Sequence, residues 1–211
     1  MAEFPGVILA GGRAQRMGGG DKCLLPLAGQ NLLDHVLARL VPQCTGVALN
    51  ANGSADRFRG YRLPILPDET ADQPGPLAGV LAAMDWAKAQ GADHVVTVAA
   101  DTPFFPRDLV TQLTGAKGFA LAASQATDEE QPRLHPIFGL WPVALAEELR
   151  TALAQGERKV RMWALDHGAQ QVVFRYGGID PFFNINTRED LRQAKAIARS
   201  SARADQCFRM K

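Results

Sequence analysis

The sequence predicts an α/β fold of three layers, an α/β/α sandwich in which helices cover both faces of a mostly parallel central sheet. Short apolar runs alternate with segments of helical periodicity, and this alternation is typical of a parallel sheet. The clearest runs lie at residues 7–10, 46–49, 63–66 and 94–100. These runs also lack an alternation of polar and apolar residues, as expected for strands that are covered on both faces.

Helices are expected between and after these strands. Apolar residues recur at helical spacing over 32–40, where Asn31 can cap the first turn and Pro42 follows the last. A second helix is expected over 77–87, closed by Gly91. The other expected helices are 54–58, 106–113, 144–153, 160–165 and 188–198, the last capped by Thr187, and the other expected strands are 119–123, 136–141 and 171–174. The polar stretch 124–133 is expected to be a loop.

Length and composition restrict the class of protein. At 211 residues the chain suits one domain, which we expect to occupy residues 1–200, with a frayed polar tail at 201–211. A net charge of +1 argues against general binding to nucleic acid or to anionic membranes. Three widely spaced cysteines, Cys23, Cys44 and Cys207, match neither a disulfide framework nor a zinc site. No apolar run approaches the roughly 18 residues of a membrane span, so we expect a cytoplasmic protein.

The stretch at 7–22 reads VILAGGRAQRMGGGDK, which places glycines and cations directly after an apolar strand. Glycines let backbone N–H groups approach an anion closely, and Arg13, Arg16 and Lys22 add positive charge to the same loop. The combination predicts a cradle for a polyphosphate. A Walker A loop would need Ser or Thr after the lysine, where Cys23 stands, and the glycines do not fit the dinucleotide-binding spacing.

Each of the first four expected strands is followed by a polar or glycine position. These positions are Gly11-Gly12, Asn50, Asp68 and Asp101. The carboxyl ends of parallel strands meet at one edge of a sheet, and ligands bind outside that edge. The sequence therefore predicts that all four positions converge on one binding site.

Several motifs together resemble the MobA-like molybdenum cofactor guanylyltransferases of the nucleotidyltransferase superfamily. They are Leu9-Ala10-Gly11-Gly12, Arg16-Met17-Gly18, Asp21-Lys22, the P-G-P-L-A-G stretch at 74–79 and Asn184-Ile185-Asn186-Thr187. The resemblance covers roughly residues 5–198 and implies a Rossmann-like fold of the nucleotide-diphospho-sugar transferase type. It also implies that GMP is transferred from GTP to the phosphate of Mo-molybdopterin, with Mg²⁺ as cofactor. The products would be the molybdopterin guanine dinucleotide cofactor and pyrophosphate.

The same resemblance implies roles for individual residues. The catalytic residues would be Lys22, Arg16 and Asp101, and Asp101 would also bind the metal. The nucleotide-binding residues would be Leu9, Ala10, Gly11, Gly12, Lys22, Asn50, Asp68, Gly79 and Asp101, in a half of the domain at about 5–115. As a separate hypothesis, we expect the acceptor to bind to the other half, at about 116–200, through Arg158, Asn184 and Asn186. Because the acceptor phosphate oxygen is already an anion, catalysis is expected to come from positioning and charge neutralisation.

The expected partners are GTP and Mo-molybdopterin, with transient contact to proteins that deliver the cofactor or mature molybdoenzymes, and the protein is expected to be a monomer. Cytidylyl transfer to molybdopterin or another phosphate acceptor stays open, although Gly12 in L-A-G-G favours the guanylyl branch. A sugar-1-phosphate nucleotidyltransferase would usually be longer and carry a second metal carboxylate. A non-catalytic GTP-binding regulator would keep the phosphate loop without needing Asp101.

Overall fold

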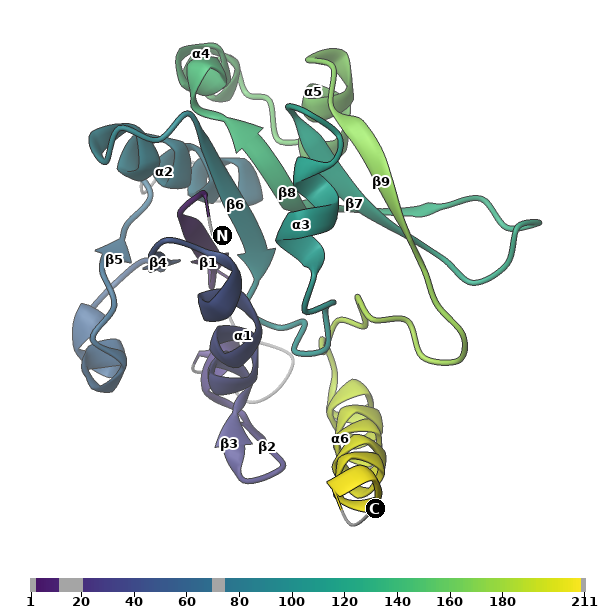
Figure 1. The fold of residues 1–211 in the computed structure, drawn as a ribbon. Helices are drawn as coiled ribbons and strands as arrows, with labels where there is room; N and C mark the ends of the chain where they lie inside the picture. The colour runs from purple at the N-terminus through teal and green to yellow at the C-terminus, as the bar shows by residue number, and fades with distance from the viewer. Residues whose placement is uncertain (1–2, 12–20, 70–74, 210–211) are drawn as a thin grey trace.

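A single seven-stranded sheet runs through the protein (Figure 1). The computed structural model describes residues 3–11, 21–69 and 75–209, with side chains up to residue 200. The strands are β1 (Gly6–Leu9), β4 (Val47–Asn50), β5 (Ile65–Leu66), β6 (His94–Ala99), β7 (Ala120–Gln125), β8 (Arg133–Pro142) and β9 (Gln170–Arg175), in the spatial order β5-β4-β1-β6-β8-β7-β9. Strand β8 runs antiparallel to β6 and β7, whereas the other neighbouring pairs are parallel. The predicted mostly parallel α/β sheet is confirmed.

Helices cover both faces of this sheet. They are α1 (Leu32–Leu40), α2 (Pro76–Ala89), α3 (Leu109–Thr114), α4 (Ala146–Ala154) and α5 (Val160–Asp166). Helix α6 (Arg188–Arg209) packs instead with Leu27 and Leu32 in a separate small cluster. Helices α1 and α3 pack with Ile8 on one face, whereas α2, α4 and α5 pack with Val7 on the other. Adjacent strand residues therefore enter opposite cores, which explains why the strands are apolar throughout. Among the described residues, no helix has the length and apolar character needed to cross a bilayer.

The structure differs from the expected elements in several places. A short hairpin, β2 (Pro26–Leu27) with β3 (Gln30–Asn31), was not expected, and α6 continues past residue 198. Strand β8 begins before Pro136 although proline lacks the N–H that a ladder needs. The pairing of β7 with β8 shifts register between Leu121 and Ala122, and Pro136 lies in the unpaired stretch of that irregularity. The expected loop 124–133 is correspondingly shorter, because β7 continues to Gln125.

The register of the sheet aligns the carboxyl ends of four strands at one edge. Leu9 of β1 lies opposite Asn50 of β4 and opposite Ala99 of β6. Asn50 in turn lies opposite Leu66 of β5. The residues that follow these strands are therefore neighbours, as the sequence predicts. Figure 1 shows the segment after β9 running from the far edge of the sheet back toward the start of α6.

Candidate functional site

The ammonium group of Lys22 is the centre of a polar cluster that joins distant parts of the chain. Lys22 Nζ lies 2.5 Å from Asp101 Oδ2, 2.5 Å from Asn186 Oδ1 and 3.5 Å from Asn184 Oδ1. Lys22 is 8% exposed, and Asp101 follows the carboxyl end of β6. The structure thus brings together four residues that the sequence singles out, three of which accept a hydrogen bond from the fourth.

The segment that carries the two asparagines is fixed at the start of α6. Ile185 N donates to the carbonyl oxygen of Asp101 at 3.0 Å, and the Ile185 side chain is buried. Asp190 accepts hydrogen bonds from Asn186 N and Thr187 N, each at 2.8 Å, and Asp190 N donates to Thr187 Oγ1 at 3.1 Å. The predicted Thr187 cap is confirmed, and this capping box orients Asn186 toward Lys22.

A second polar cluster lies at the ends of β4 and β5. Asn50 Nδ2 donates to Leu66 O at 3.0 Å and to Asp68 Oδ1 at 2.8 Å. Asn52, which was not predicted as a site residue, donates to Asp68 Oδ2 at 2.6 Å and accepts from Asp68 N at 2.8 Å. The Asp68 carboxylate is therefore held from both sides. The spacing Asn50-x-Asn52 was the available signal, because residues two apart in an extended segment point the same way.

Strand β1 joins the two clusters. Ala10 N donates to Asn50 O at 2.9 Å, and Ala100 N donates to Leu9 O at 3.1 Å. Two inter-strand spacings separate β4 from β6, so the clusters stand on the order of 10 Å apart. Such a separation suits a ligand with a base at one end and phosphates at the other. Gly11 is exposed at the tip of β1, whereas the predicted Gly12 and Arg16 lie outside the described residues.

Arg57 links the two clusters a second time, and no motif in the sequence predicts this link. Arg57 Nε lies 2.7 Å from a carboxylate oxygen of Asp21, the residue before Lys22. The same guanidinium donates to the carbonyl oxygens of Asn52 and Ser54. Although the Nε–H does not point at the carboxylate well enough to count as a hydrogen bond, the two opposite charges are in direct contact. The loop after β4 and the start of the Lys22 segment are thereby linked.

Gly79, in the first turn of α2, lies directly against Asn50. A Cβ atom added at Gly79 would overlap Asn50 Oδ1 and would stand 3.1 Å from Asn50 Cγ and 3.3 Å from Leu9 Cδ2. A side chain at this position would therefore displace the amide that holds Asp68. Gly79 is predicted to bind the nucleotide, and the close approach that the structure shows there is to the side chain of Asn50.

We expect Gly79→Ala to weaken nucleotide binding by roughly 10-fold, because the new methyl group forces Asn50 out of its hydrogen bonds, each worth about 1 kcal/mol. Isothermal titration with GTP and Mg²⁺ measures the change. Gly60→Ala, at an exposed glycine that has open space around its Cβ and no left-handed φ, is the control for a general effect of replacing glycine. Equal affinities of Gly79→Ala and the unmodified protein would contradict this role of Gly79.

Arg158 belongs to neither cluster. Its guanidinium Nη1 donates to Leu153 O at 3.0 Å, in the last turn of α4, and to Glu157 O at 2.5 Å, in the connection between α4 and α5. Its Cδ atom would lie 3.8 Å from a Cβ added at Gly75, the residue just before α2. Arg158 is thus beside the start of the helix that carries Gly79, but it makes no described contact with Asn184 or Asn186.

The oxygen atoms around Lys22 suit a hard divalent cation. One carboxylate oxygen and two amide oxygens, from Asp101, Asn184 and Asn186, already converge on one positive charge. Mg²⁺ is usually bound through one or two carboxylates together with phosphates and waters. Among the described residues, no group of three or more His, Cys, Asp or Glu side chains could hold a metal alone. The residues present therefore fit a metal that arrives with phosphate ligands.

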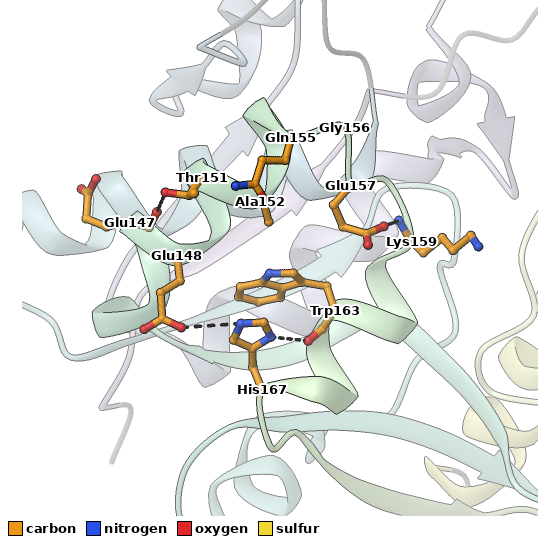
Figure 2. A pocket seen from close by; sticks show the side chains of 10 residues that line it. All are labelled: Glu147, Glu148, Thr151, Ala152, Gln155, Gly156, Glu157, Lys159, Trp163 and His167. Atoms are coloured by element: carbon orange, nitrogen blue, oxygen red, sulfur yellow. Dashed lines mark hydrogen bonds and ion pairs between the residues drawn. The ribbon is translucent and has the colours of Figure 1, made fainter.

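A large open hollow of about 850 Å³ lies elsewhere, between α4 and α5 (Figure 2). Figure 2 shows His167 stacked on Trp163 and joined to Glu148. The residues lining it are Glu147, Glu148, Thr151, Ala152, Gln155, Gly156, Glu157, Lys159, Trp163 and His167. None of the predicted site residues is among them. Convergent polar groups distinguish a binding site better than volume does, so the strand ends are the candidate site.

Two further groups near the site have shifted pKa values. Burial, reinforced by Asp21, raises the pKa of the Cys23 thiol to about 12, so this thiol is not an activated nucleophile. Burial lowers the pKa of His135 to about 4, with nearby Asp180 opposing the shift and Arg133 adding to it. His135 is therefore neutral near pH 7.

The His135 shift predicts a loss of stability in acid. The unfolded chain binds a proton at His135 below its ordinary pKa of about 6.5, whereas the native protein binds it only near pH 4. Stability should therefore fall as the pH falls through this window. Urea unfolding at pH 7 and pH 4.5 should show a smaller acid-induced loss for His135→Gln than for the unmodified protein. Equal acid-induced losses of stability in the two proteins would contradict the lowered pKa of His135.

Comparison with known proteins gives the family. Residues 6–171 match the family model described as the MobA-like NTP transferase domain. A molybdenum cofactor guanylyltransferase of Bradyrhizobium sp. (strain ORS 278) is 46% identical over 202 residues, which is 92% of each chain. One from Cereibacter sphaeroides is 46% identical over 197 residues, covering 93% of this chain and 98% of the relative.

Solved structures share the fold. The molybdopterin-guanine dinucleotide biosynthesis protein A of Archaeoglobus fulgidus superposes with a TM-score of 0.69 at 24% identity, covering 93% of this chain and all of the other. A putative glucose-1-phosphate thymidylyltransferase of Bacillus anthracis superposes with a TM-score of 0.70 at 17% identity, covering 93% and 95% of the two chains. At these identities the likeness concerns architecture alone. The family match and the close relatives show that the chain belongs to the MobA-like NTP transferases.

Proposed function

We propose that this protein transfers GMP from GTP to the terminal phosphate of Mo-molybdopterin, forming the guanine dinucleotide cofactor and pyrophosphate. Relatives named molybdenum cofactor guanylyltransferase, 46% identical over 92% of the chain, support the proposal. The structural observation that carries it is the convergence of Lys22, Asp101, Asn184 and Asn186 beside the strand ends that hold Asn50 and Asp68. We further propose that the protein acts in the cytoplasm as a monomer.

Guanine and ribose would bind at the cluster of Asn50 and Asp68. An amide offers a donor and an acceptor, and a carboxylate accepts from a ring N–H or a ribose hydroxyl. Asn52 would keep the Asp68 carboxylate in place, and Gly79 would leave room for the Asn50 amide. The backbone of residues 9–12, with Lys22 and Arg16, would then receive the phosphates.

Charge neutralisation would be the main catalytic contribution of the Lys22 cluster. Mg²⁺, held by Asp101 and the nucleotide phosphates, would stabilise negative charge on the transferring group. Lys22 already contacts two acceptors at 2.5 Å, and it would exchange one of them for a phosphate oxygen when nucleotide binds. Asn184 and Asn186 would hold the ammonium during that exchange.

An oxygen of the acceptor phosphate would form a bond to the α-phosphorus of GTP while the bond from that phosphorus to the bridging oxygen of the leaving pyrophosphate breaks. The attacking oxygen is ionised at neutral pH, so no base is needed. Positioning and electrostatic stabilisation would supply the rate enhancement. Lys22 would neutralise charge on the departing pyrophosphate.

A nucleotide screen tests the proposal. Thermal stabilisation is measured with GTP, CTP, ATP and UTP in the presence of Mg²⁺, and products formed with Mo-molybdopterin are identified by mass spectrometry. We expect the largest shift with GTP, and we expect the guanine dinucleotide cofactor and pyrophosphate as products. A larger shift with CTP would favour the cytidylyl alternative. GTP binding without pyrophosphate release would instead favour a non-catalytic regulator.

The acceptor side has its own test. We propose that Arg158, Asn184 and Asn186 contribute to binding of the acceptor, with Arg158 approaching from the start of α2. Arg158→Ala and Asn184→Ala should then raise the KM for the acceptor more than the KM for GTP. If neither variant changed acceptor affinity, the acceptor would have to bind elsewhere.

A further inference from the structure

A buried serine links two strands to the segment that leads into the Lys22 cluster. Ser124 Oγ lies 2.7 Å from His135 Nε2 and 3.1 Å from Asp180 Oδ2, and Ser124 is 2% exposed. His135 of β8 lies opposite Ala122 of β7, so Ser124, two residues further along β7, shares its face of the sheet. The three residues form a continuous line of hydrogen bonds, which we call the His135 relay.

The chemistry of the groups sets the direction of each hydrogen bond in the relay. The Asp180 carboxylate can only accept, so the Ser124 hydroxyl donates to it. The Ser124 oxygen then accepts from His135, whose hydrogen must be on Nε2. In a hydrolase triad the acid contacts the imidazole instead and leaves the serine free to attack. Here the hydroxyl is buried and committed to the carboxylate, so it is not a nucleophile.

The relay fixes the beginning of the segment 180–186. Asp180 Oδ1 accepts from Phe182 N at 2.9 Å, and Asp180 O accepts from Phe183 N at 3.0 Å. The His135 ring stacks on the Phe182 ring with centroids 4.4 Å apart and an interplanar angle of 17°. Phe182 is itself buried in the core between the sheet and α1 and α3. Three separate contacts therefore hold the chain at this turn.

The other end of the segment 180–186 reaches the Lys22 cluster within a few residues. Asn184 and Asn186 accept hydrogen bonds from Lys22, and Ile185 N donates to Asp101 O. The chain between Phe182 and Asn184 is too short to absorb a displacement of Asp180. A shift at the relay is therefore expected to reach the asparagine oxygens through Phe183, against the anchors that Ile185 N and the Asp190 side chain provide.

We propose that His135, Ser124 and Asp180 are positioning residues that place Asn184 and Asn186 against Lys22 for the transfer reaction. The inference rests on the proposed guanylyl transfer. A displacement of about 1 Å in a catalytic group can slow a reaction by about 100-fold. The relay does not touch Asn50 or Asp68. Disrupting the relay should therefore lower turnover and leave GTP binding intact.

Ser124→Ala removes the central hydroxyl with little change in volume. The matched control is Thr97→Ala, which removes another buried hydroxyl of the same sheet, one that donates to Ile137 O and accepts from Trp141 Nε1 at 2.7 Å. We expect Ser124→Ala to lower kcat by 10- to 100-fold with the KM for GTP within twofold of its starting value. Thr97→Ala should destabilise the fold yet leave kcat within twofold. Equal losses of kcat in both variants would overturn the proposal.

The position of the histidine hydrogen gives a test that does not depend on activity. In the unmodified protein, ¹⁵N spectra should show the Nε2–H tautomer of His135. In Asp180→Asn, Phe182 N–H retains the amide oxygen, so the amide NH₂ faces Ser124 and the hydroxyl hydrogen loses its carboxylate acceptor, which leaves His135 Nε2 as its favoured acceptor. The hydrogen of His135 should then move to Nδ1. The same tautomer in both proteins would show that the relay does not exist.

Hydrogen exchange separates this inference from the proposed function. Amides of 182–187 should exchange faster in Ser124→Ala than in Thr97→Ala, whether or not transfer to molybdopterin is observed. If the unmodified protein formed no guanine dinucleotide, the proposed function would fail by itself. If exchange over 182–187 were the same in both variants, the positioning role would fail even in an active enzyme.

Discussion

Replacing Asp101 with Asn should lower kcat for guanylyl transfer by about 100- to 1,000-fold, the range typical for loss of a group that stabilises charge in a transition state. Asparagine keeps the shape of the side chain and can still accept from Lys22, which lies 2.5 Å away. It cannot supply the negative charge that holds a divalent cation. Steady-state assays over a range of Mg²⁺ concentrations measure both kcat and the metal requirement.

The guanine end of the site should be unaffected in Asp101→Asn, because Asn50 and Asp68 are held by β4, β5 and Asn52. Binding of GTP without Mg²⁺ should therefore stay within a few fold of the unmodified protein. Asp108→Asn, at an exposed carboxylate in the connection that also follows β6, controls for loss of surface charge. Normal turnover in Asp101→Asn would contradict a metal-binding role of Asp101.

Lys22→Met should reduce both turnover and nucleotide affinity. The ammonium is nine-tenths buried among three oxygens, and hydrogen bonds to charged groups are each worth about 1.5–3 kcal/mol. We expect kcat to fall by about 100-fold or more and GTP to bind at least about 10-fold more weakly. Calorimetric titration and single-turnover kinetics separate the two effects. Lys88→Met, at an exposed lysine of α2, should change neither.

A double variant tests whether Lys22 stabilises the fold by neutralising Asp101. Lys22→Met leaves the half-buried Asp101 carboxylate without its cation, which destabilises the native state. Adding Asp101→Asn removes that unpaired charge, so the double variant should unfold at a higher temperature than Lys22→Met alone. Its turnover should stay as low as that of either single variant. An unfolding temperature of the double variant no higher than that of Lys22→Met would contradict this stabilising role of Lys22.

The fold was predictable because local patterns and global architecture agree. Apolar runs such as 94–100 could only be strands covered on both faces, and the alternation with helices required a parallel sheet. The early start of β8 was missed because Pro136 argues against a strand, and only the register shift opposite Leu121 and Ala122 makes it acceptable. Similarly, the apolar pattern that predicts α6 weakens after 198, yet the helix continues.

The strand-end positions of the candidate site were predictable for the same reason. Lys22, Asn50, Asp68 and Asp101 follow apolar strands or belong to the glycine-rich loop, so topology alone places them at one edge. Long-range partners were not predictable. Arg57 reaches Asp21 from a short helical segment with no motif, and the Ser124–Asp180 hydrogen bond joins residues far apart in sequence. Such contacts depend on tertiary packing, which periodicity does not encode.

The central claim is that the strand ends surround one nucleotide. A crystal structure of the protein with a non-hydrolysable GTP analogue and Mg²⁺ tests it most directly. We expect guanine against Asn50 and Asp68, phosphates beside Lys22, and the metal on an oxygen of Asp101. A nucleotide bound in the hollow between α4 and α5, or one that contacts Asn50 and Asp68 while its phosphates point away from Lys22 and Asp101, would contradict the claim.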